Sequence, residues 1–556
     1  MLYVITLFFC FISVVYATPL FTDLLRSLKL FDEPDNGRKI HKEPIPRMGG
    51  VIIYSITILF LFFLYPNVSN IKYFLTGSLI IFLLGVVDDI KNLPWHTKFL
   101  GQSVAAVFLI LFLGNHGYFN FNFAGIILPE FLTIPLLFIF IVGTLNSFNL
   151  LDGLDGLVAG FALLLSVLSF FLSLGTNNSF VTLLSVILFG VTLGFLKFNS
   201  NPASIFLGDS GSLTIAYFSL AVLLSSFAEA SNHSIDLVFM GIILSVPLID
   251  TIRVMAIRIA NKKHPFLPDN NHIHHIIYSK KIRHKTTVFI ILALTLISFL
   301  VGLFYNFTSK ILGLILFIIF AGFLLFIDNI LDFIVRKENL LYYGRLFKKL
   351  PANFAKVFKY YFLPIITFVL FSFIVYLIVY KVSSNDKRFI YLLIFNLLTI
   401  TYVLINLKSR NYISEIFVLI NFILFFYTTG LTNIFNKLYP VPIINFININ
   451  QIISLLIIPV IVFYFLFRER ISLIKSENFL NGLELIIALL VVFSYLFIKF
   501  TAISPTYNLI GEILTRSFMF YLFYKIVANC FPKLHIPLYF SSFVFVIIVL
   551  VKAIIS

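Results

Sequence analysis

The chain has 556 residues, of which 60% are hydrophobic and 12% are charged, and its mean hydropathy is +1.04. Soluble domains are about 25% charged, so this composition excludes a soluble globular protein and predicts an all-α polytopic integral membrane protein. The net charge of +16 does not indicate nucleic-acid binding, because the basic residues lie in short segments between apolar stretches.

Apolar runs of about 17–25 residues, long enough to cross a bilayer, recur along the whole chain. We expect a core of about 11 spans, near 3–22, 49–65, 71–88, 98–114, 130–147, 157–175, 179–197, 211–228, 236–258, 286–306 and 311–334. About 7 additional C-terminal spans follow, near 361–381, 389–407, 411–428, 452–467, 478–499, 508–526 and 535–552.

Charge sets the expected orientation. The first apolar run resembles a signal peptide, but its basic residues, Arg26 and Lys29, follow the run instead of preceding it. We therefore expect a retained first span with its N-terminus outside. With this start, the basic segments, including 38–47 and 336–349, all fall on one side, which the positive-inside rule assigns to the cytoplasm.

The two parts of the chain differ in their loops. Up to about 285 the cytoplasmic loops are rich in Asp, Asn, His and Gly, whereas after 335 they carry scattered Lys and Arg. We expect a functional domain over 1–334, a basic cytoplasmic linker over 335–360, and a C-terminal transmembrane extension of unknown role over 361–556.

Asp88 and Asp89 end the third predicted span, in the stretch GVVDDI. Adjacent helical positions point about 100° apart, so one carboxylate can meet a substrate proton or a metal while the other is held differently. Two adjacent carboxylates raise one another's pKa, which suits a general base. The alternative is a solvated helix end.

Four polar side chains recur every three residues in the stretch NSFNLLDGLDGL. They are Asn146, Asn149, Asp152 and Asp155. On a helix this spacing forms a ridge, but Gly153 and Gly156 argue against a continuous helix and let backbone approach a phosphate or a sugar. Amides can donate to a phosphate and carboxylates can hold a cation. A structural cap and turn would explain one Asn and one Asp-Gly, but not the whole repeat.

Asp209 lies between Gly208 and Gly211 in the stretch FLGDSGS, just before the eighth predicted span. Most Gly-Asp-x-Gly tetrads are turns, but at a membrane edge in a chain with few acids this aspartate is a candidate metal ligand. Oxygen ligands suit Mg²⁺ or Mn²⁺ better than zinc. The only cysteines, Cys10 and Cys530, lie at opposite ends of the chain, which argues against a disulfide framework or a thiolate metal site.

A histidine cluster follows the ninth predicted span, in HPFLPDNNHIHH. It comprises His272, His274 and His275, with Lys262, Lys263 and Lys280 nearby. Zinc is one interpretation, but the histidines are too close together for the usual ligand spacing. Binding of a diphosphate or nucleotide is favoured, and a solvated loop is the remaining alternative.

Carboxylates, a divalent cation and anion-binding groups on one cytoplasmic face are what phosphoryl transfer requires. An acceptor reachable from the bilayer points to a lipid phosphate. A membrane transporter is a rival interpretation, but carriers place charged groups near the middle of the bilayer, whereas these cluster in loops and helix ends. A catalytically inactive scaffold is a third alternative, which the retained acids weaken.

Five motifs occur in a familiar order: DEPDNGRKIHKEPIPRMGG, GVVDDI, NSFNLLDGLDGL, FLGDSGS and HPFLPDNNHIHH. Over about residues 1–330 the chain thereby resembles the polyprenyl-phosphate N-acetylhexosamine-1-phosphate transferases, a glycosyltransferase family 4 within the muramoyl-pentapeptide transferase superfamily. The resemblance implies an eleven-span transferase core and transfer of a sugar 1-phosphate from a UDP-sugar to undecaprenyl phosphate, with UMP leaving. It also implies a need for Mg²⁺.

The same resemblance implies a bacterial cytoplasmic (inner) membrane protein with its active site on the cytoplasmic side, and it allows a homodimer. The reaction would be the first membrane step of a cell-surface polysaccharide pathway, such as lipopolysaccharide O-antigen synthesis. The histidine loop reads His-x-His-His, which favours the GlcNAc-1-phosphate transferases over the muramoyl-pentapeptide branch. Lys91 follows the Asp-Asp pair by two residues instead of three, which argues the same way. Other N-acetylated UDP-sugars remain open.

By motif, the resemblance implies roles for individual residues. The catalytic residues would be Asp88, Asp89 and Asp152, and the metal ligands Asp209 and Asn149. Substrate binding would fall to Asn146, Asn149, Asp155, His272, His274, His275, Pro265, Phe266 and Lys98. Whether Asp88 or Asp89 acts as the base, and whether transfer is direct or passes through a covalent aspartyl intermediate, stays open.

Overall fold

The computed structural model describes residues 2–336 apart from 33–43, 66–67, 117–119, 124–125, 177, 227–233, 265–270 and 281, and beyond 336 it describes 482–501, 505–530 and a few short stretches between 360 and 461. The chain divides into two compact units. One contains Met1–Arg336 and Asn481–Thr501, and the other contains Lys337–Leu480 and Ala502–Ser556. The first unit therefore includes one segment from the predicted C-terminal extension.

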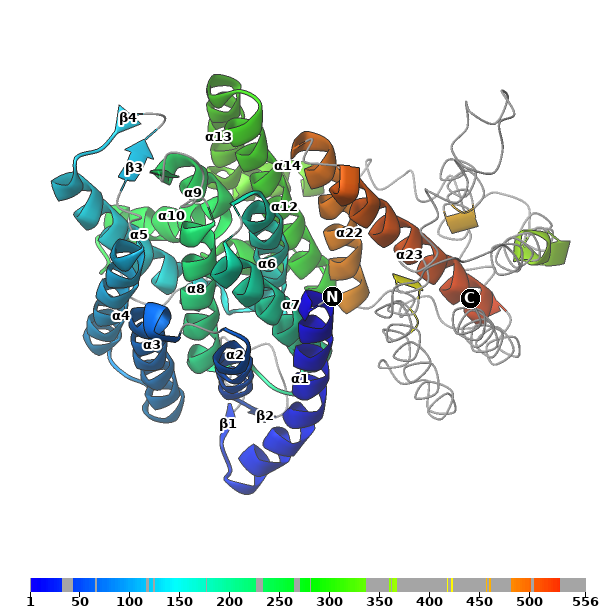
Figure 1. The fold of residues 1–556 in the computed structure, drawn as a ribbon, viewed down its shortest axis with the longest axis horizontal. Coiled ribbons are helices and arrows are strands. Elements are labelled where there is room, and N and C mark those ends of the chain that lie inside the picture. Colours follow the sequence, from blue (N-terminus) through cyan, green and yellow to red (C-terminus); the bar gives the residue numbers. More distant parts are fainter. Residues whose placement is uncertain are drawn as a thin grey trace. The chain divides into compact units, whose positions relative to one another are not determined.

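The described part of the first unit is built mainly of helices (Figure 1). They are α1 (Leu2–Ser27), α2 (Gly50–Leu64), η1 (Val68–Ile71), α3 (Lys72–Lys91), α4 (Trp95–Asn115), α5 (Glu130–Leu151), α6 (Leu157–Thr176), α7 (Ser179–Asn199), α8 (Gly208–Ser225), α9 (Leu237–Ile243), α10 (Ser245–Ala260), α11 (Ile273–Ser279), α12 (His284–Phe307), α13 (Lys310–Leu325), α14 (Ile327–Arg336) and α22 (Gly482–Thr501). Each of the first eleven predicted spans coincides with one of these helices or with a consecutive pair.

Six helices within the described residues are long and apolar enough to cross a membrane, or seven if the bent pair α9 and α10 is one span. This confirms the predicted helical, multi-span architecture, while the full count of spans stays a prediction. Two of the predicted C-terminal spans coincide with α22 and, in the other unit, α23 (Pro505–Cys530). The other five lie wholly or largely outside the described residues.

Helix α8 forms the centre of the first unit. It packs against α2, α3, α5, α6 and α7, and every residue from Ser210 to Ser225 is buried. Its sequence is apolar or small on all sides, and a helix with no polar face must be surrounded by other elements. The N-terminus of α8, which carries Asp209, is consequently fixed by its neighbours.

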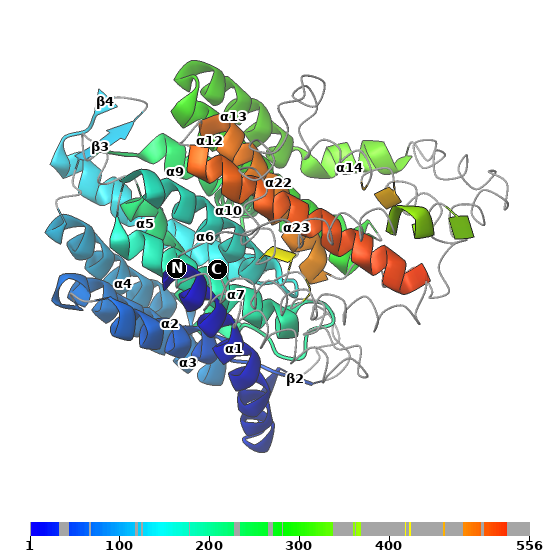
Figure 2. The same cartoon turned by 45° about the vertical axis from the view of Figure 1, so that its right-hand side comes forward.

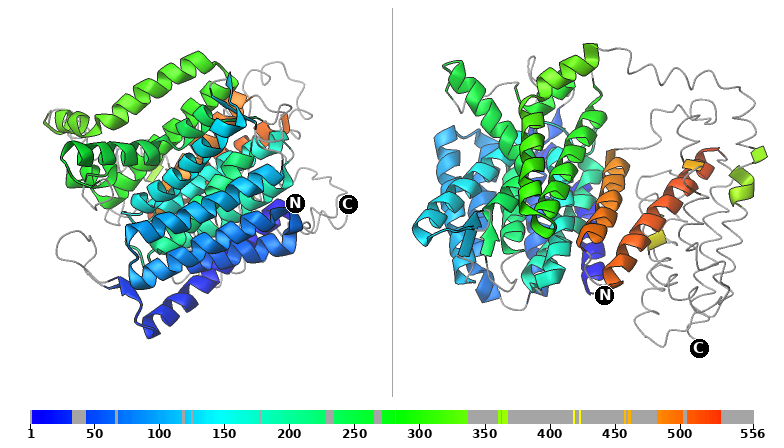
Figure 3. Two further views of the ribbon diagram at one scale, coloured as in Figure 1. Left: turned by 90° about the vertical axis from the view of Figure 1, so that its left-hand side faces the viewer. Right: turned by 90° about the horizontal axis from the view of Figure 1, so that it is seen from above.

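The remaining helices are arranged around this centre. Figure 2 shows α2, α3 and α4 side by side, and Figure 3 shows the same group from two further directions. Helix α1 packs along α7 and α2, and α3 packs along α4 and α8. On another side, α12 packs against α6, α9, α13 and α22.

The ninth predicted span, 236–258, is not a single straight helix. Helices α9 and α10 meet at an angle of 83°, with Leu244 between them. Pro247 has no N–H to donate to the carbonyl of Ile243 four residues earlier. The hydroxyl of Ser298 donates to that carbonyl instead, at 3.3 Å, so the break is stabilised by α12. The eleventh predicted span is likewise divided, at Phe326, into α13 and α14.

Short strands, which are not predicted from the sequence, lie between the ends of some helices. Strand β1 (Phe31–Asp32) pairs antiparallel with β2 (Ile45–Pro46). A second sheet has the order β4-β3-β5, formed by β4 (Ile126–Ile127), β3 (Asn120–Phe123) and β5 (Ser234–Asp236). Strand β3 is antiparallel to β4 and parallel to β5. The first pair matters for the site because Arg47 directly follows β2.

Candidate active site

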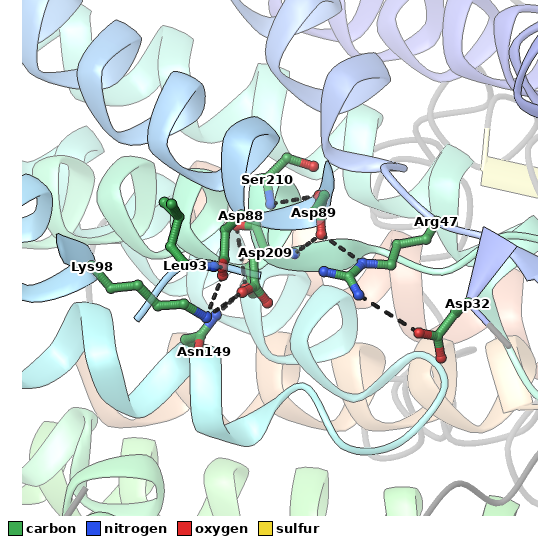
Figure 4. A network of polar contacts seen from close by, with 10 residues as sticks. Asp32, Arg47, Asp88, Asp89, Leu93, Lys98, Asn149, Asp209 and Ser210 are labelled. Carbon is green, nitrogen blue, oxygen red and sulfur yellow. Dashed lines mark hydrogen bonds and ion pairs between the residues drawn. The ribbon is translucent and has the colours of Figure 1, made fainter. Parts of the chain in front are cut away.

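Asp89, in the last turn of α3, lies between Arg47 and the start of α8 (Figure 4). Its carboxylate accepts hydrogen bonds from Nε of Arg47 at 2.9 Å, from the backbone N–H of Asp209 at 2.8 Å and from that of Ser210 at 3.0 Å. Its side chain is 0% exposed. An acceptor of this kind satisfies free N–H groups at a helix N-terminus and is stabilised by the helix dipole. Asp89 therefore holds the start of α8 in place.

A close approach of two backbones makes this contact feasible. Gly85 lies one turn before Asp89 on α3, and a Cβ atom there would lie 2.5 Å from Cα of Ser210 and 2.6 Å from the carbonyl oxygen of Asp209. Glycine is the only residue that leaves this space free. Arg47, which also lies 3.6 Å from Asp32, closes the other side of the contact.

Asp88 points to a different group, Lys98 of α4. Its Oδ1 accepts the backbone N–H of Leu93 at 2.6 Å, and its Oδ2 forms an ion pair with Nζ of Lys98. The same Nζ lies 2.9 Å from Oδ2 of Asp209. One ammonium group therefore bridges two carboxylates from α3 and α8.

The Asn-Asn-Asp-Asp repeat is divided between a helix and a turn. Helix α5 ends at Leu151, so Asn146 and Asn149 lie on the helix while Asp152 and Asp155 lie in the turn before α6. This agrees with the expectation that the helix would not continue. Nδ2 of Asn149 donates to the hydroxyl of Ser212 at 3.2 Å, which ties α5 to the first turn of α8.

Asp152 is the helix cap of α5 and lies next to other acids. Burial raises its pKa to about 8, and the charges of Asp89 and Asp155 act in the same direction. Its carboxyl group is therefore largely protonated at pH 7. It can donate a hydrogen bond, and an approaching positive charge would favour its ionised form.

The turn that carries Asp155 is fixed to the loop after α7. Asp155 Oδ2 accepts from Nδ2 of Asn201 at 2.9 Å and from the N–H of Ala203 at 3.2 Å. The buried side chain of Asn199 accepts the N–H of Gly156 at 3.0 Å and donates to the carbonyl of Ile205 at 3.1 Å. These contacts fix the acidic turn, which lines the cavity described below.

Asp250 of α10 organises the histidine cluster. Its Oδ2 lies 2.9 Å from Nδ1 of His272, and its Oδ1 accepts the N–H of Ile273 at 2.9 Å. Arg253 donates to Asp250 Oδ1 at 3.1 Å and also to the carbonyl of Asn271. The start of α11 is therefore anchored to α10 by one buried carboxylate.

His274 and His275 have different environments. His274 is 2% exposed, and its ring lies against the backbone of the acidic turn, since a Cβ on Gly153 would lie 2.2 Å from its Nε2. Burial, followed by the charge of His275, lowers the pKa of His274 to about 3, so this ring is neutral at pH 7. The two rings are 4.2 Å apart between centroids.

A cavity of about 920 Å³ joins these elements. Of the predicted site residues, Asp152, Asp155, Asp209 and His275 line it. Asp89, Lys98 and Asn149 adjoin it through their contacts with α8, and Asp88 is joined to that group through Lys98. His272 and His274 do not line the cavity, and the ring of His274 is close to the rings of both His272 and His275. Asn146 lies one turn from Asn149 and does not line the cavity, and Pro265 and Phe266 are outside the described residues.

Several contributors were not predicted from the sequence. Arg47, Asn199, Asn201, Asp250, Arg253 and His284 hold or line the site. Arg47 is the last basic residue of the motif that ends in MGG. Its place in that motif is the sequence feature that could have indicated its role. Asp250 is an acid inside an apolar stretch, which is itself a sign of function.

A divalent metal fits this donor set. Within the described residues, no three His, Cys, Asp or Glu side chains converge to hold a metal by themselves. Asp88 and Asp209 do converge on one cation, the ammonium of Lys98. Mg²⁺ is usually bound by one or two carboxylates together with substrate phosphates, so two carboxylates beside a large cavity are suitable ligands.

Comparisons with known proteins identify the family to which the chain is similar. Residues 71–227 match the family described as "Glycosyl transferase family 4". A probable undecaprenyl-phosphate N-acetylglucosaminyl 1-phosphate transferase of Bacillus subtilis is 32% identical over 323 residues, which are 56% of this chain and 86% of the relative. The chain belongs to glycosyl transferase family 4.

Two further relatives show the breadth of family 4. An undecaprenyl-phosphate alpha-N-acetylglucosaminyl 1-phosphate transferase of Thermotoga maritima is 30% identical over 52% of this chain and 87% of its own length. A phospho-N-acetylmuramoyl-pentapeptide-transferase of a Thermoanaerobacter species is 35% identical over 37% of this chain and 69% of its own length. The family 4 match covers the acids of α3, α5 and α8 but ends before α11, which we refer to as the histidine helix because it carries His274 and His275.

Proposed function

We propose that this protein transfers N-acetylglucosamine 1-phosphate from UDP-N-acetylglucosamine to undecaprenyl phosphate at the cytoplasmic side of a bacterial inner membrane. The names of the two relatives aligned over 86% and 87% of their lengths describe this transfer. The single observation that carries the proposal is the convergence of Asp88 and Asp209 on one cation at the edge of a 920 Å³ cavity.

In the proposed reaction, an oxygen of the lipid phosphate attacks the phosphorus that bears the sugar. The bond from that phosphorus to the oxygen of the uridine-side phosphate breaks, and UMP leaves with the bonding electrons. The products are undecaprenyl diphosphate N-acetylglucosamine and UMP. Such transfers depend mostly on positioning and charge neutralisation, which the surrounding side chains supply.

Asp88 is better suited than Asp89 to act on the lipid phosphate. All three hydrogen bonds to Asp89 come from groups at the contact between α3 and α8. If the Asp89 carboxylate turned to a phosphate, these hydrogen bonds would break and the site would be disrupted. Oδ2 of Asp88 is paired with the flexible Lys98, which can move to a phosphate. Asp88 would then accept the proton of a monoprotonated lipid phosphate or help to orient its oxygen.

A bound Mg²⁺ or Mn²⁺ would be held by Asp209, with Asn149 beside it through its contact with Ser212 of α8, which leaves Asp88 for the lipid phosphate. When bound, the ion would neutralise charge on the diphosphate. Lys98 would add a second positive charge beside it. His275 of α11, which lines the cavity, would contact the nucleotide-sugar.

A reconstituted transfer assay tests this proposal. Purified protein in liposomes receives undecaprenyl phosphate, Mg²⁺ and one of several labelled UDP-N-acetylhexosamines. We expect labelled lipid from UDP-N-acetylglucosamine and its loss with EDTA. Absence of lipid product from every donor, with intact donor binding, would refute the transferase assignment.

The two neighbouring acids provide a matched comparison in the same assay. Asp88→Asn should lower kcat by at least about 100-fold, as expected for loss of a proton acceptor, with little change in the thermal midpoint. Asp89→Asn should cost about 1.5–3 kcal/mol of stability, because it weakens charged hydrogen bonds in a buried contact. Equal effects of the two substitutions on both quantities would contradict the division of roles.

A further inference from the structure

Helix α11 is anchored at both ends. Its first residues are tied to Asp250, as described above. At its other end, the side chain of Lys280, the helix cap, reaches α14. Nζ of Lys280 lies 2.8 Å from Oδ1 of Asp328 and 2.6 Å from Oδ1 of Asp332. We refer to these three side chains as the clasp.

The clasp joins elements that are distant in sequence. Asp328 and Asp332 are one turn apart on α14, on the same face of that helix, so a single ammonium group meets both. The hydrogen bond from Lys280 to Asp328 raises the pKa of the lysine, and the hydrogen bond to Asp332 raises it further. The lysine is therefore charged. The sequence predicts Lys280 near an anion pocket, whereas in the structure its ammonium group is paired with two carboxylates.

Stability alone does not explain this arrangement. The side chains of Asp328 and Asp332 are 50% and 43% exposed, and exposed ion pairs contribute little to folding free energy. Two acids on one rigid helix do, however, fix the location of a charged group. The clasp should therefore affect the position of α11 more than the stability of the fold.

The position of α11 matters to the cavity because two of its residues are in contact with the site. The ring of His274 packs on Gly153 in the acidic turn, and His275 lines the cavity. A shift of α11 by a fraction of an ångström would move His275. It would also change the packing of His274 against the turn that carries Asp152. In a close-packed region such shifts are transmitted to neighbours.

We propose that the clasp of Lys280, Asp328 and Asp332 positions the histidine helix for binding of the nucleotide-sugar donor. These three are positioning residues, since they act through α11. The inference rests on the proposed function of the cavity. Helix α14 ends at Arg336, where the first unit gives way to the second, so the clasp also ties α11 to the segment through which the chain leaves the first unit.

The test measures KM for UDP-N-acetylglucosamine, KM for undecaprenyl phosphate and kcat in Lys280→Gln, in the double variant Asp328→Asn/Asp332→Asn, and in the combination of all three changes. We expect donor KM to rise about 3- to 10-fold in each, with kcat and lipid KM within about 2-fold of wild type. The combination should be no worse than either part, because the same interaction is lost. Lys280→Arg, which keeps the charge, should restore the wild-type donor KM.

A matched control is Lys72→Gln, the same change at an exposed lysine that begins α3, at the opposite end of that helix from Asp88, and it should leave all three constants unchanged. The dissociation constant of UDP-N-acetylglucosamine, measured directly by calorimetry, tests the clasp independently of turnover. Unchanged donor affinity in the clasp variants, or a fall in kcat with unchanged donor KM, would overturn the inference. A wild-type protein that binds the donor but transfers nothing would instead refute the proposed function.

Discussion

Asp88 and Asp89 are adjacent in the chain but are held by different partners. Both side chains are almost fully buried, at 1% and 0% exposed, but their partners differ. Asp89 receives its hydrogen bonds from Arg47 and the start of α8, and Asp88 is paired with a lysine that also meets Asp209. The sequence predicted that the two would be held differently, since adjacent helical positions diverge, but it could not predict which neighbour each would meet.

His274 provides a prediction about pH and stability. Its pKa in the folded protein is about 3, below the value of about 6.5 in an unfolded chain. Its contribution to stability is therefore present above about pH 6.5 and is lost as pH falls towards 3, because only the unfolded state binds the proton. At pH 5 this loss amounts to about 2 kcal/mol.

The measurement is the thermal unfolding midpoint in detergent at pH 7.5 and at pH 5.0. The decrease between the two pH values should be smaller in His274→Gln than in the wild type. His96→Gln, which alters an exposed side chain, should keep the wild-type decrease. If His274→Gln shows the full wild-type decrease, the ring is not buried in its neutral form.

The contact between α3 and α8 offers a prediction for pairs of helices. In Gly85→Ala, the new Cβ would lie 2.5 Å from backbone atoms of α8, so the helices must separate. We expect a loss of about 1–3 kcal/mol in stability. We also expect a decrease of at least about 10-fold in kcat, since a barrier higher by about 1.4 kcal/mol has this effect. Transfer activity and the thermal midpoint measure both quantities.

Gly143→Ala is the matched control, because it also lies within a helix and a Cβ there would meet nothing within 4 Å. Alanine is favoured over glycine in helices by about 1 kcal/mol, so this variant should be as active as the wild type and no less stable. Similar losses in both variants would show that the α3–α8 distance does not limit the site.

Element positions were largely predictable from hydropathy, because the length of a membrane-crossing helix is set by bilayer thickness. The break between α9 and α10 was not. It depends on a hydrogen bond from the hydroxyl of Ser298, on a helix distant in sequence, to the carbonyl of Ile243. The sequence around Ile243 does not indicate this partner. The strands β1 and β2, each of two residues, are too short to produce a pattern.

For the molecule as a whole, the notable feature is that the first unit includes α22, which lies far along the chain. It packs on α12 and α6, and the ring of Phe493 lies 5.8 Å from that of Phe299. Hydropathy predicts this segment as part of the C-terminal extension, because it identifies a span but not the neighbours of that span. The polar site residues were predictable by type, whereas the acids and amides that hold them required the tertiary structure.

Phe493→Ala tests whether α22 supports the first unit. Phe493 is 0% exposed, and removing a buried Phe costs about 3–5 kcal/mol, so the thermal midpoint should fall and transferase activity should be lost at a lower temperature. Val492→Ala, at a neighbouring position that is 49% exposed, should change neither. Identical behaviour of the two variants would mean that α22 does not stabilise this unit.

The most direct measurement for the whole account follows the two phosphates of UDP-N-acetylglucosamine during transfer. Donor labelled at the sugar-linked phosphorus, or at the uridine-linked phosphorus, is incubated with liposomes that contain the protein and undecaprenyl phosphate. Label on the sugar side should appear in the lipid and label on the uridine side in UMP, one for one, and Asp209→Asn should abolish both while donor binding persists. Release of UDP with both labels, or transfer that survives Asp209→Asn, would contradict the proposed transfer of a sugar 1-phosphate at this site.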